Sequence, residues 1–181
     1  IAPGEFQTIA IAGSDAFATE YGFNPDYELF EDSGSADAIP DMLEALPGSI
    51  NGQGGLTNGG EVAVLYTWDG NADLVRDIDY VVWGDKDEAV DKSGVGIDGP
   101  DADNDPSFYA FETPIIDQDV VALAAHATGD SFQRLDFTEG AEAQVGGNGI
   151  SGADETSEDA SSTWGQVTVS RSLATMNSSR L

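Results

Sequence analysis

Four aspartates in one long acidic loop are the side chains of this chain best suited to chemistry. Carboxylates at alternating positions can converge on one hard cation, and Ca²⁺ takes about six to eight oxygen ligands. The loop spans residues 84–114, a length that is usually functional in a compact domain. The sequence therefore predicts a calcium site, with a solvated acidic loop as the alternative. The predicted ligands are Asp98, Asp101, Asp103 and Asp105.

An EF-hand is disfavoured as the form of this site. Glu112 does stand at the twelfth position counted from Asp101, as that motif requires. The sixth position, however, needs glycine and here holds Pro106, which cannot take the required turn. No helical pattern flanks the loop, so an irregular calcium loop remains the hypothesis. A second, weaker acidic group comprises Asp85, Asp87, Glu88 and Asp91.

Other patterns that could carry chemistry are weaker still. Residues 147–152 match GxGxxG, but no clear strand precedes them and no helix opens there, which argues against a dinucleotide site. The glycine-rich loop 52–60 contains no lysine and does not predict a phosphate cradle. His126, the only histidine, lies in an apolar run where a structural role is commoner than catalysis. The tryptophans Trp68, Trp83 and Trp164 allow a sugar platform, although core packing is favoured for the first two.

The composition excludes several classes of function. The 34 acidic and 6 basic side chains give a net charge of −28, which repels nucleic-acid phosphates and anionic membranes. There is no cysteine, so disulfides and thiolate metal sites are excluded. No apolar run approaches the ~20 residues of a membrane span, and no membrane insertion is predicted.

A predicted hairpin is the element that must position the acidic loop. Two runs rich in β-branched and aromatic residues, 61–68 and 74–83, flank the turn at 69–71. Gly70 can supply the positive φ that a tight reversal needs. Alternation in the second run predicts an antiparallel pair with one buried face. The residues expected to form this central hairpin are Val62, Val64, Tyr66, Ile78, Tyr80 and Val82.

The remaining elements are short. One helix is predicted over 15–21, with Ser14 as its cap and Gly22 as its stop. A second is predicted over 38–46, with Pro40 in its first turn. The apolar run 115–127 fits either a strand or a helix. Further strands are predicted over 5–12, 131–137 and 164–170, with irregular structure over 138–163.

Several of these motifs together resemble the lamin-tail domain family. The matching pieces are 1–12, 17–23, 56–61, 69–71 and 80–85, followed by 129–140 and 146–164, which are similar to the continuation of bacterial members. The resemblance implies an all-β, immunoglobulin-like β-sandwich with long acidic loops and one or two short helices. It implies that residues 1–137 form the sandwich and that 138–181 form a Gly/Ser/acidic extension with a last strand.

The resemblance, together with the acidic loop, leads to three hypotheses about what the chain does. The family's opening strands have no counterpart before Ile1, so unpaired sheet edges are expected. The first hypothesis is a noncatalytic, calcium-stabilised module for adhesion or assembly, located outside the cell or at its surface. The second is a filament or surface-layer subunit completed by a strand from another protein chain, including a copy of itself. The third is an accessory part of a secreted metal-dependent hydrolase, a phosphoesterase or nuclease.

Overall fold

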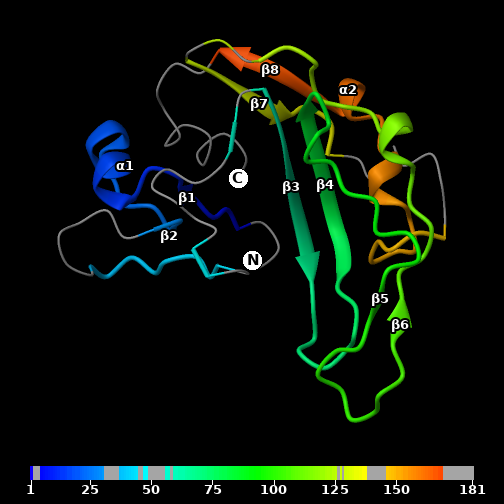
Figure 1. The fold of residues 1–181 in the computed structure, drawn as a ribbon. Helices are drawn as coiled ribbons and strands as arrows, with labels where there is room; N and C mark the ends of the chain where they lie inside the picture. The colour runs from blue at the N-terminus through cyan, green and yellow to red at the C-terminus, as the bar shows by residue number, and fades with distance from the viewer. Residues whose placement is uncertain are drawn as a thin grey trace. The chain divides into compact units, whose positions relative to one another are not determined.

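Strands outnumber helices in this protein, and they lie in small sheets (Figure 1). The computed structural model describes residues 1, 5–30, 37–44, 47–48, 56–57, 59–125, 127, 129–137 and 146–168. Within these residues every sheet has two strands, and none closes into a barrel. The chain divides into two compact units, with the described residues up to Leu56 in the first and Thr57–Thr168 in the second.

The first unit is built on a strand–helix–strand segment. Strand β1 (Ile9–Ala10) pairs in parallel with β2 (Tyr27–Glu28), and helix α1 (Ser14–Tyr21) connects them. The predicted strand 5–12 is therefore much shorter in the structure. Phe17 contacts Tyr21 one helical turn away, with ring centroids 4.6 Å apart.

The ends of α1 agree only in part with the sequence prediction. Gly22 ends the helix in the left-handed conformation, and its N–H donates to the Ala18 carbonyl at 2.9 Å, as expected. The predicted cap at Ser14 is wrong, because Gly13 takes the cap position and Ser14 is already helical. The buried carboxylate of Glu28 on β2 accepts the Ser14 N–H instead, at 2.6 Å. A tertiary contact thus replaces the local cap.

The predicted second helix over 38–46 is wrong for its described residues. This segment runs beside β2 and pairs with it: the Glu28 N–H donates to the Pro40 carbonyl, and the Met42 N–H donates to the Glu28 carbonyl. Backbone groups that bond to a strand are no longer available to a helix.

The second unit contains the predicted hairpin, which is confirmed. Strands β3 (Gly60–Thr67) and β4 (Arg76–Gly84) pair in antiparallel fashion and are the longest strands among the described residues (Figure 1). Gly70 in the connection has a φ of 84°, a conformation that glycine adopts without steric cost. At the other end, a side chain on Gly84 would overlap the Gly59 carbonyl oxygen.

A β-bulge decides which face of β4 is buried. The register shifts between Leu65 and Tyr66, so that Tyr66 lies opposite Asp77 and Ile78 is the extra residue. An extra residue reverses the alternation of side chains beyond it. Asp77 is therefore buried at 2% exposure, although the alternation predicts Ile78 for that face. On β3, Val64 and Tyr66 belong to the hairpin as predicted, but both side chains are exposed.

The core of the second unit forms where another segment joins β4. Tyr80 and Val82 pack with Ala89 and Val120, and Val62 packs against this cluster. The apolar run 115–127, predicted as a strand or a helix, begins as a short 3-10 helix, η1 (Ile115–Asp117). The backbone becomes extended at the residue that follows η1. Its extended part bonds to β4, since the Val121 N–H donates to the Val82 carbonyl and the Gly84 N–H to the Ala122 carbonyl.

The remaining elements complete the second unit. Strand β7 (Asp130–Arg134) pairs with β8 (Trp164–Thr168), which confirms two predicted strands and joins residues on both sides of the predicted boundary at 137/138. Within the acidic loop, β5 (Gly96–Ile97) and β6 (Ser107–Phe108) form a small hairpin that the sequence did not predict. A 3-10 turn, η2 (Glu155–Ser157), and the short α2 (Ala160–Thr163) precede β8.

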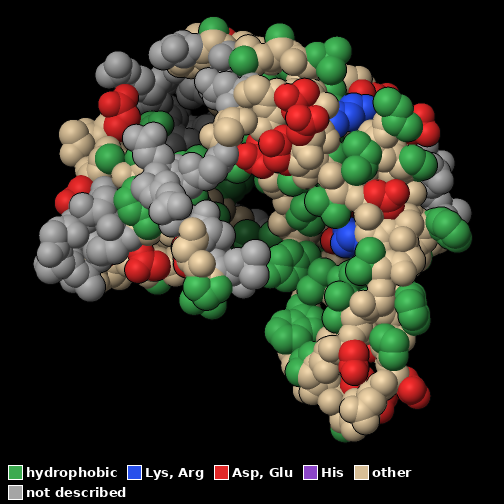
Figure 2. All heavy atoms as spheres, in the orientation of Figure 1, with side chains coloured by type: hydrophobic (Ala, Val, Ile, Leu, Met, Phe, Trp, Pro, Cys, Tyr) green, Lys and Arg blue, Asp and Glu red, His purple; other side chains and the backbone are tan. Residues whose placement is uncertain are grey.

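The tryptophans lie in separate surroundings. Trp83 packs against Phe132 of β7, with ring centroids 6.2 Å apart. Trp164 packs against the Arg134 guanidinium. Trp68 is half exposed at the hairpin turn, so the core position favoured for it is wrong. In the space-filling view, acidic side chains recur across the visible face, whereas Lys and Arg show at few places (Figure 2).

Replacement of Tyr80 tests the core. Its hydroxyl donates to Gln118 Oε1 at 2.9 Å and accepts the Val90 N–H at 3.0 Å. Tyr80→Phe removes both hydrogen bonds and leaves the fully buried Gln118 Oε1 without this donor, and we expect it to lower the free energy of unfolding by about 1–3 kcal/mol in a urea titration. The matched control is Tyr66→Phe on the facing strand, exposed at 57%, which should change stability by less than about 0.5 kcal/mol. Equal effects of the two variants would contradict this account of the core.

Candidate cation site

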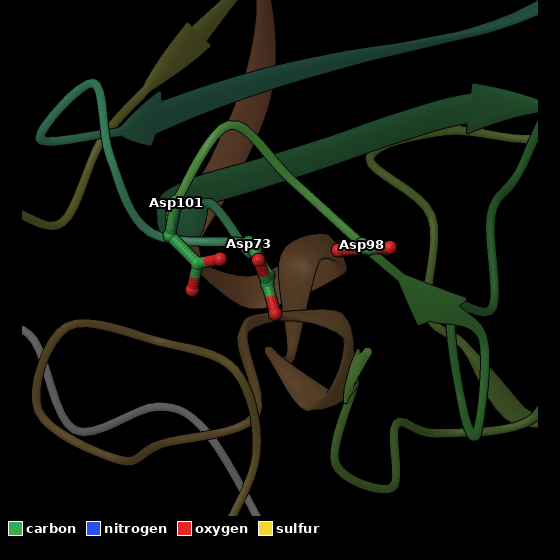
Figure 3. A group of neighbouring side chains, drawn as sticks. All are labelled: Asp73, Asp98 and Asp101. Carbon is green, nitrogen blue, oxygen red and sulfur yellow. The ribbon is translucent and has the colours of Figure 1, made fainter. Parts of the chain in front are cut away.

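Three carboxylates from two connections of the second unit meet at one point. Asp73 precedes β4, Asp98 follows β5, and Asp101 lies in the turn between β5 and β6. One oxygen from each lies within 4.8 Å of the others. Figure 3 shows the carboxylates of Asp73 and Asp101 close together, with Asp98 beside them.

Asp73 positions this group by holding the small β5–β6 hairpin. Its Oδ1 accepts the Gly99 N–H at 2.8 Å, and its Oδ2 accepts the Ser107 N–H at 3.0 Å. A side chain at Gly99 would come within 2.7 Å of the Asp73 Cα, so this approach requires glycine. The bond from Gly99 and those from Ser107 hold the pKa of Asp73 below its ordinary value. Asp73 thus stays ionised under mildly acidic conditions.

Asp98 and Asp101, two of the four predicted ligands, belong to this group, whereas Asp103 and Asp105 lie outside it. Asp101 and Asp103 close successive turns, in which their Oδ1 atoms accept the N–H groups of Asp103 and Asp105. Sequence reasoning missed Asp73, which is far from the loop in sequence. Its position at the end of the predicted hairpin turn was the available signal.

The second acidic group of the loop forms local turns. Asp85 accepts the Asp87 N–H, and Asp91 accepts the Ser93 N–H. Within the part of the chain that the structure describes, no metal-sized cluster includes these residues. They act as turn formers, the usual role of aspartate in such connections.

A second charged cluster is buried beneath β4. Lys92 Nζ lies 2.8 Å from Asp77 Oδ2 and 2.7 Å from Glu112 Oε1. Asn148 Nδ2 donates to the same Glu112 oxygen at 2.9 Å. One cation here faces two buried anions, so the cluster retains a negative charge. The sequence had offered Glu112 only as an EF-hand position, because nothing local links these residues.

The pKa values of Asp77 and Lys92 are shifted by burial and by the neighbouring charges. Burial raises the pKa of Asp77, and Lys92 opposes this shift only in part. Burial lowers the pKa of Lys92, but its hydrogen bonds to Asp77 and Glu112 outweigh that effect, so the pKa is raised overall. Burial thus favours the protonated form of Asp77 relative to an aspartate in water.

A third ionic cluster joins β7 to its neighbours. Arg134 donates from Nη1 to Asp79 at 2.6 Å and from Nη2 to Glu158 at 2.7 Å. Its guanidinium lies 5.9 Å from the centroid of the Trp164 ring. Arginine cannot act as a nucleophile or base here, so this cluster has a structural role.

The other sequence patterns add no further site. Residues 147–152 form turns, in which Gly149 forms a bridge with Asp77, and no helix opens there. A nucleotide fingerprint requires such a helix. His126 and most of the 52–60 loop lie outside the described residues. In the described part of the chain, no helix has the length and apolar character needed to cross a bilayer.

No protein-family model matches this chain, and neither a curated protein nor a solved structure does so.

Asp73→Asn tests how the site is positioned. The two N–H groups bind different oxygens of Asp73, whereas an amide side chain has only one acceptor oxygen and cannot receive both in this arrangement. We expect faster amide hydrogen exchange at Gly99 or Ser107, measured by NMR. The control is Asp69→Asn in the preceding turn, where Oδ1 alone accepts both N–H groups and an asparagine can replace it. Unchanged exchange in Asp73→Asn would contradict this role.

The pH dependence of the same contact has a defined sign. Because the folded pKa of Asp73 is lowered, its bonds to the hairpin persist below 3.8, the ordinary value, and are lost only as pH falls through the lowered pKa. An NMR titration of the Gly99 amide shift should therefore have its midpoint below 3.8. A midpoint at or above that value would overturn the assignment.

Proposed function

We propose that this chain is a noncatalytic, calcium-stabilised module of an extracellular or cell-surface protein, acting in adhesion or structural assembly. The single observation that carries the proposal is the convergence of Asp73, Asp98 and Asp101. These side chains come from two separate connections. A cation between them would attach the acidic loop to the central hairpin and relieve repulsion among like charges.

Calcium is the cation that this donor set suits. The group offers carboxylate oxygens, and two of its three residues are exposed. Ca²⁺ accepts flexible oxygen coordination completed by water. Mg²⁺ demands a stricter octahedral arrangement. Extracellular calcium modules bind with dissociation constants of about 10⁻⁴–10⁻³ M, which fits a site with three carboxylates and open solvent.

An immunoglobulin-like β-sandwich of the lamin-tail type is the fold proposed with this function. Contacts between β4 and β7 support it, since Trp83 packs on Phe132 and Arg134 bonds to Asp79. These contacts bring the β3–β4 and β7–β8 pairs together within the second unit. The motifs that resemble that family include the β3–β4 turn and the end of β4.

A protein partner is favoured by the exposed side chains of the hairpin. A soluble domain rarely leaves neighbouring large apolar side chains in water unless they make contacts elsewhere. Self-association would have to overcome the net charge of −28, which acts over a Debye length of about 8 Å at physiological salt. The exposed residues are Val64, Leu65, Tyr66 and Trp68.

Calcium titration tests the cation site directly. We expect isothermal calorimetry to show binding at millimolar or lower calcium, and Asp101→Asn to weaken it at least tenfold by removing one ligand charge. Saturating calcium at 100 times the dissociation constant should add about 2.7 kcal/mol to the free energy of unfolding. The matched control is Asp105→Asn, in the same loop but outside the cluster. No heat of binding and no shift in melting temperature with EDTA would reject the site.

Sedimentation velocity across calcium and sodium chloride concentrations tests the assembly part of the proposal. Association that increases with calcium would support a surface layer or filament. Association that follows monovalent salt equally would indicate general charge screening instead. A monomer under every condition would reject self-assembly and leave a module that binds other proteins.

A further inference from the structure

The buried cluster of Lys92, Asp77 and Glu112 has the geometry of a reaction centre as well as that of an ion pair. The Lys92 Nζ lies 2.8 Å from Asp77 Oδ2, which leaves the carboxyl carbon Cγ one bond further away. The same Nζ lies 2.7 Å from Glu112 Oε1. The amine of Lys92 therefore contacts both a carboxyl group and a second carboxyl group that can carry a proton.

The two carboxyl groups are held in place by the backbone around them. Asp77 is fixed within β4, and its N–H donates to the Asn148 carbonyl while its own carbonyl accepts the Ile150 N–H. Glu112 Oε2 accepts the main-chain N–H of Lys92 at 2.6 Å, and its Oε1 accepts Asn148 Nδ2. Fixed reactants greatly increase the effective concentration of one for the other.

Besides fixed positions, a reaction in which an amine and a carboxyl group join with loss of water needs a site that excludes water, and burial provides it. The side chains of Asp77 and Glu112 are 3% and 1% exposed, and that of Lys92 is 18% exposed. Water that leaves such a site is not replaced freely, so hydrolysis of the product is disfavoured. Burial also raises the pKa of Asp77, which favours the neutral carboxyl group that an amine can attack.

We propose that Lys92 and Asp77 condense into an intramolecular isopeptide bond, with Glu112 as the catalytic proton carrier. The ammonium proton of Lys92 passes to the Asp77 carboxylate, and the free Nζ then attacks Cγ. Glu112 Oε1 takes a proton from Nζ and delivers it to the departing Oδ. One C–N bond forms, one C–O bond breaks and one water molecule leaves, without oxidant, reductant or cofactor.

The bond would join the start of β4 to the acidic loop that follows it. A covalent link between residues 15 apart in sequence restricts the unfolded chain, as a disulfide does. This chain contains no cysteine with which to form a disulfide. The inference is independent of the calcium site, whose residues lie outside this cluster.

Mass spectrometry of the intact, denatured chain tests the proposal. We expect the mass to be lower than that of the sequence by one water molecule, and proteolysis to yield a branched peptide joining Lys92 to Asp77. Lys92→Arg keeps the charge but removes the nucleophile, and Glu112→Gln keeps the shape but removes the proton carrier. Both should have the full mass of their sequences. Asp91→Asn, an exposed neighbour of Lys92, is the control that should still lose water.

Asp77→Asn best distinguishes an isopeptide bond from a simple ion pair. Attack on its amide would release ammonia in place of water and yield the same product as the original chain. The original chain and this variant should therefore reach one identical mass, although their sequences differ. A full, uncondensed mass for the folded original chain would overturn the proposal, as would a link to any residue other than Asp77. These results do not depend on whether the Lys92 or Glu112 variants fold.

Discussion

The scarcity of positive charge is the constraint on which much of the second unit depends. Six basic side chains stand against 34 acidic ones, so each buried carboxylate competes for few partners. Lys92 lies between Asp77 and Glu112, and Arg134 between Asp79 and Glu158. Buried carboxylates without such partners would carry a large desolvation penalty. These two cations therefore add ion pairs that join β4 and β7 to segments distant in sequence.

Lys86 is another basic side chain that binds two acceptors at once. It adopts a left-handed backbone conformation, with a φ of 69°, which is uncommon for a residue with a side chain. Its ammonium group donates to the carbonyl oxygens of Ile116 and Gln118. The strained turn after β4 is thus held by bonds to η1 and its end. The acidic loop begins from a position that the core controls.

The candidate cation site and the Lys92 cluster both depend on the conformation of β4 and of the turn before it. The cation group requires Asp73, which the hairpin turn places just before β4. The lysine cluster requires Asp77, which the bulge directs inward in place of Ile78. Without that extra residue the register would place an apolar side chain beside Lys92. A local irregularity in one strand therefore determines the chemistry available beneath it.

The sequence by itself determined the local features. Strong alternation and Gly70 were sufficient to predict the β3–β4 hairpin, short runs predicted β7 and β8, and the glycine stop at Gly22 helped to predict α1. Residue type and spacing singled out Asp98 and Asp101, because carboxylates that are close in sequence can be grouped without knowing the fold. Local signals failed in the described part of 38–46, residues 38–44, where pairing with β2 replaces the predicted helix.

Only the tertiary structure decided which distant residues meet. Asp73 joins the acidic turn through the β5–β6 hairpin, and Lys92 meets Asp77 and Glu112 across 15 and 20 residues of chain. The register shift near Tyr66 also left no local signature, since its cost and benefit lie in packing against other segments. Contacts of this kind depend on burial and charge pairing between separate elements. A pattern read along one element cannot contain them.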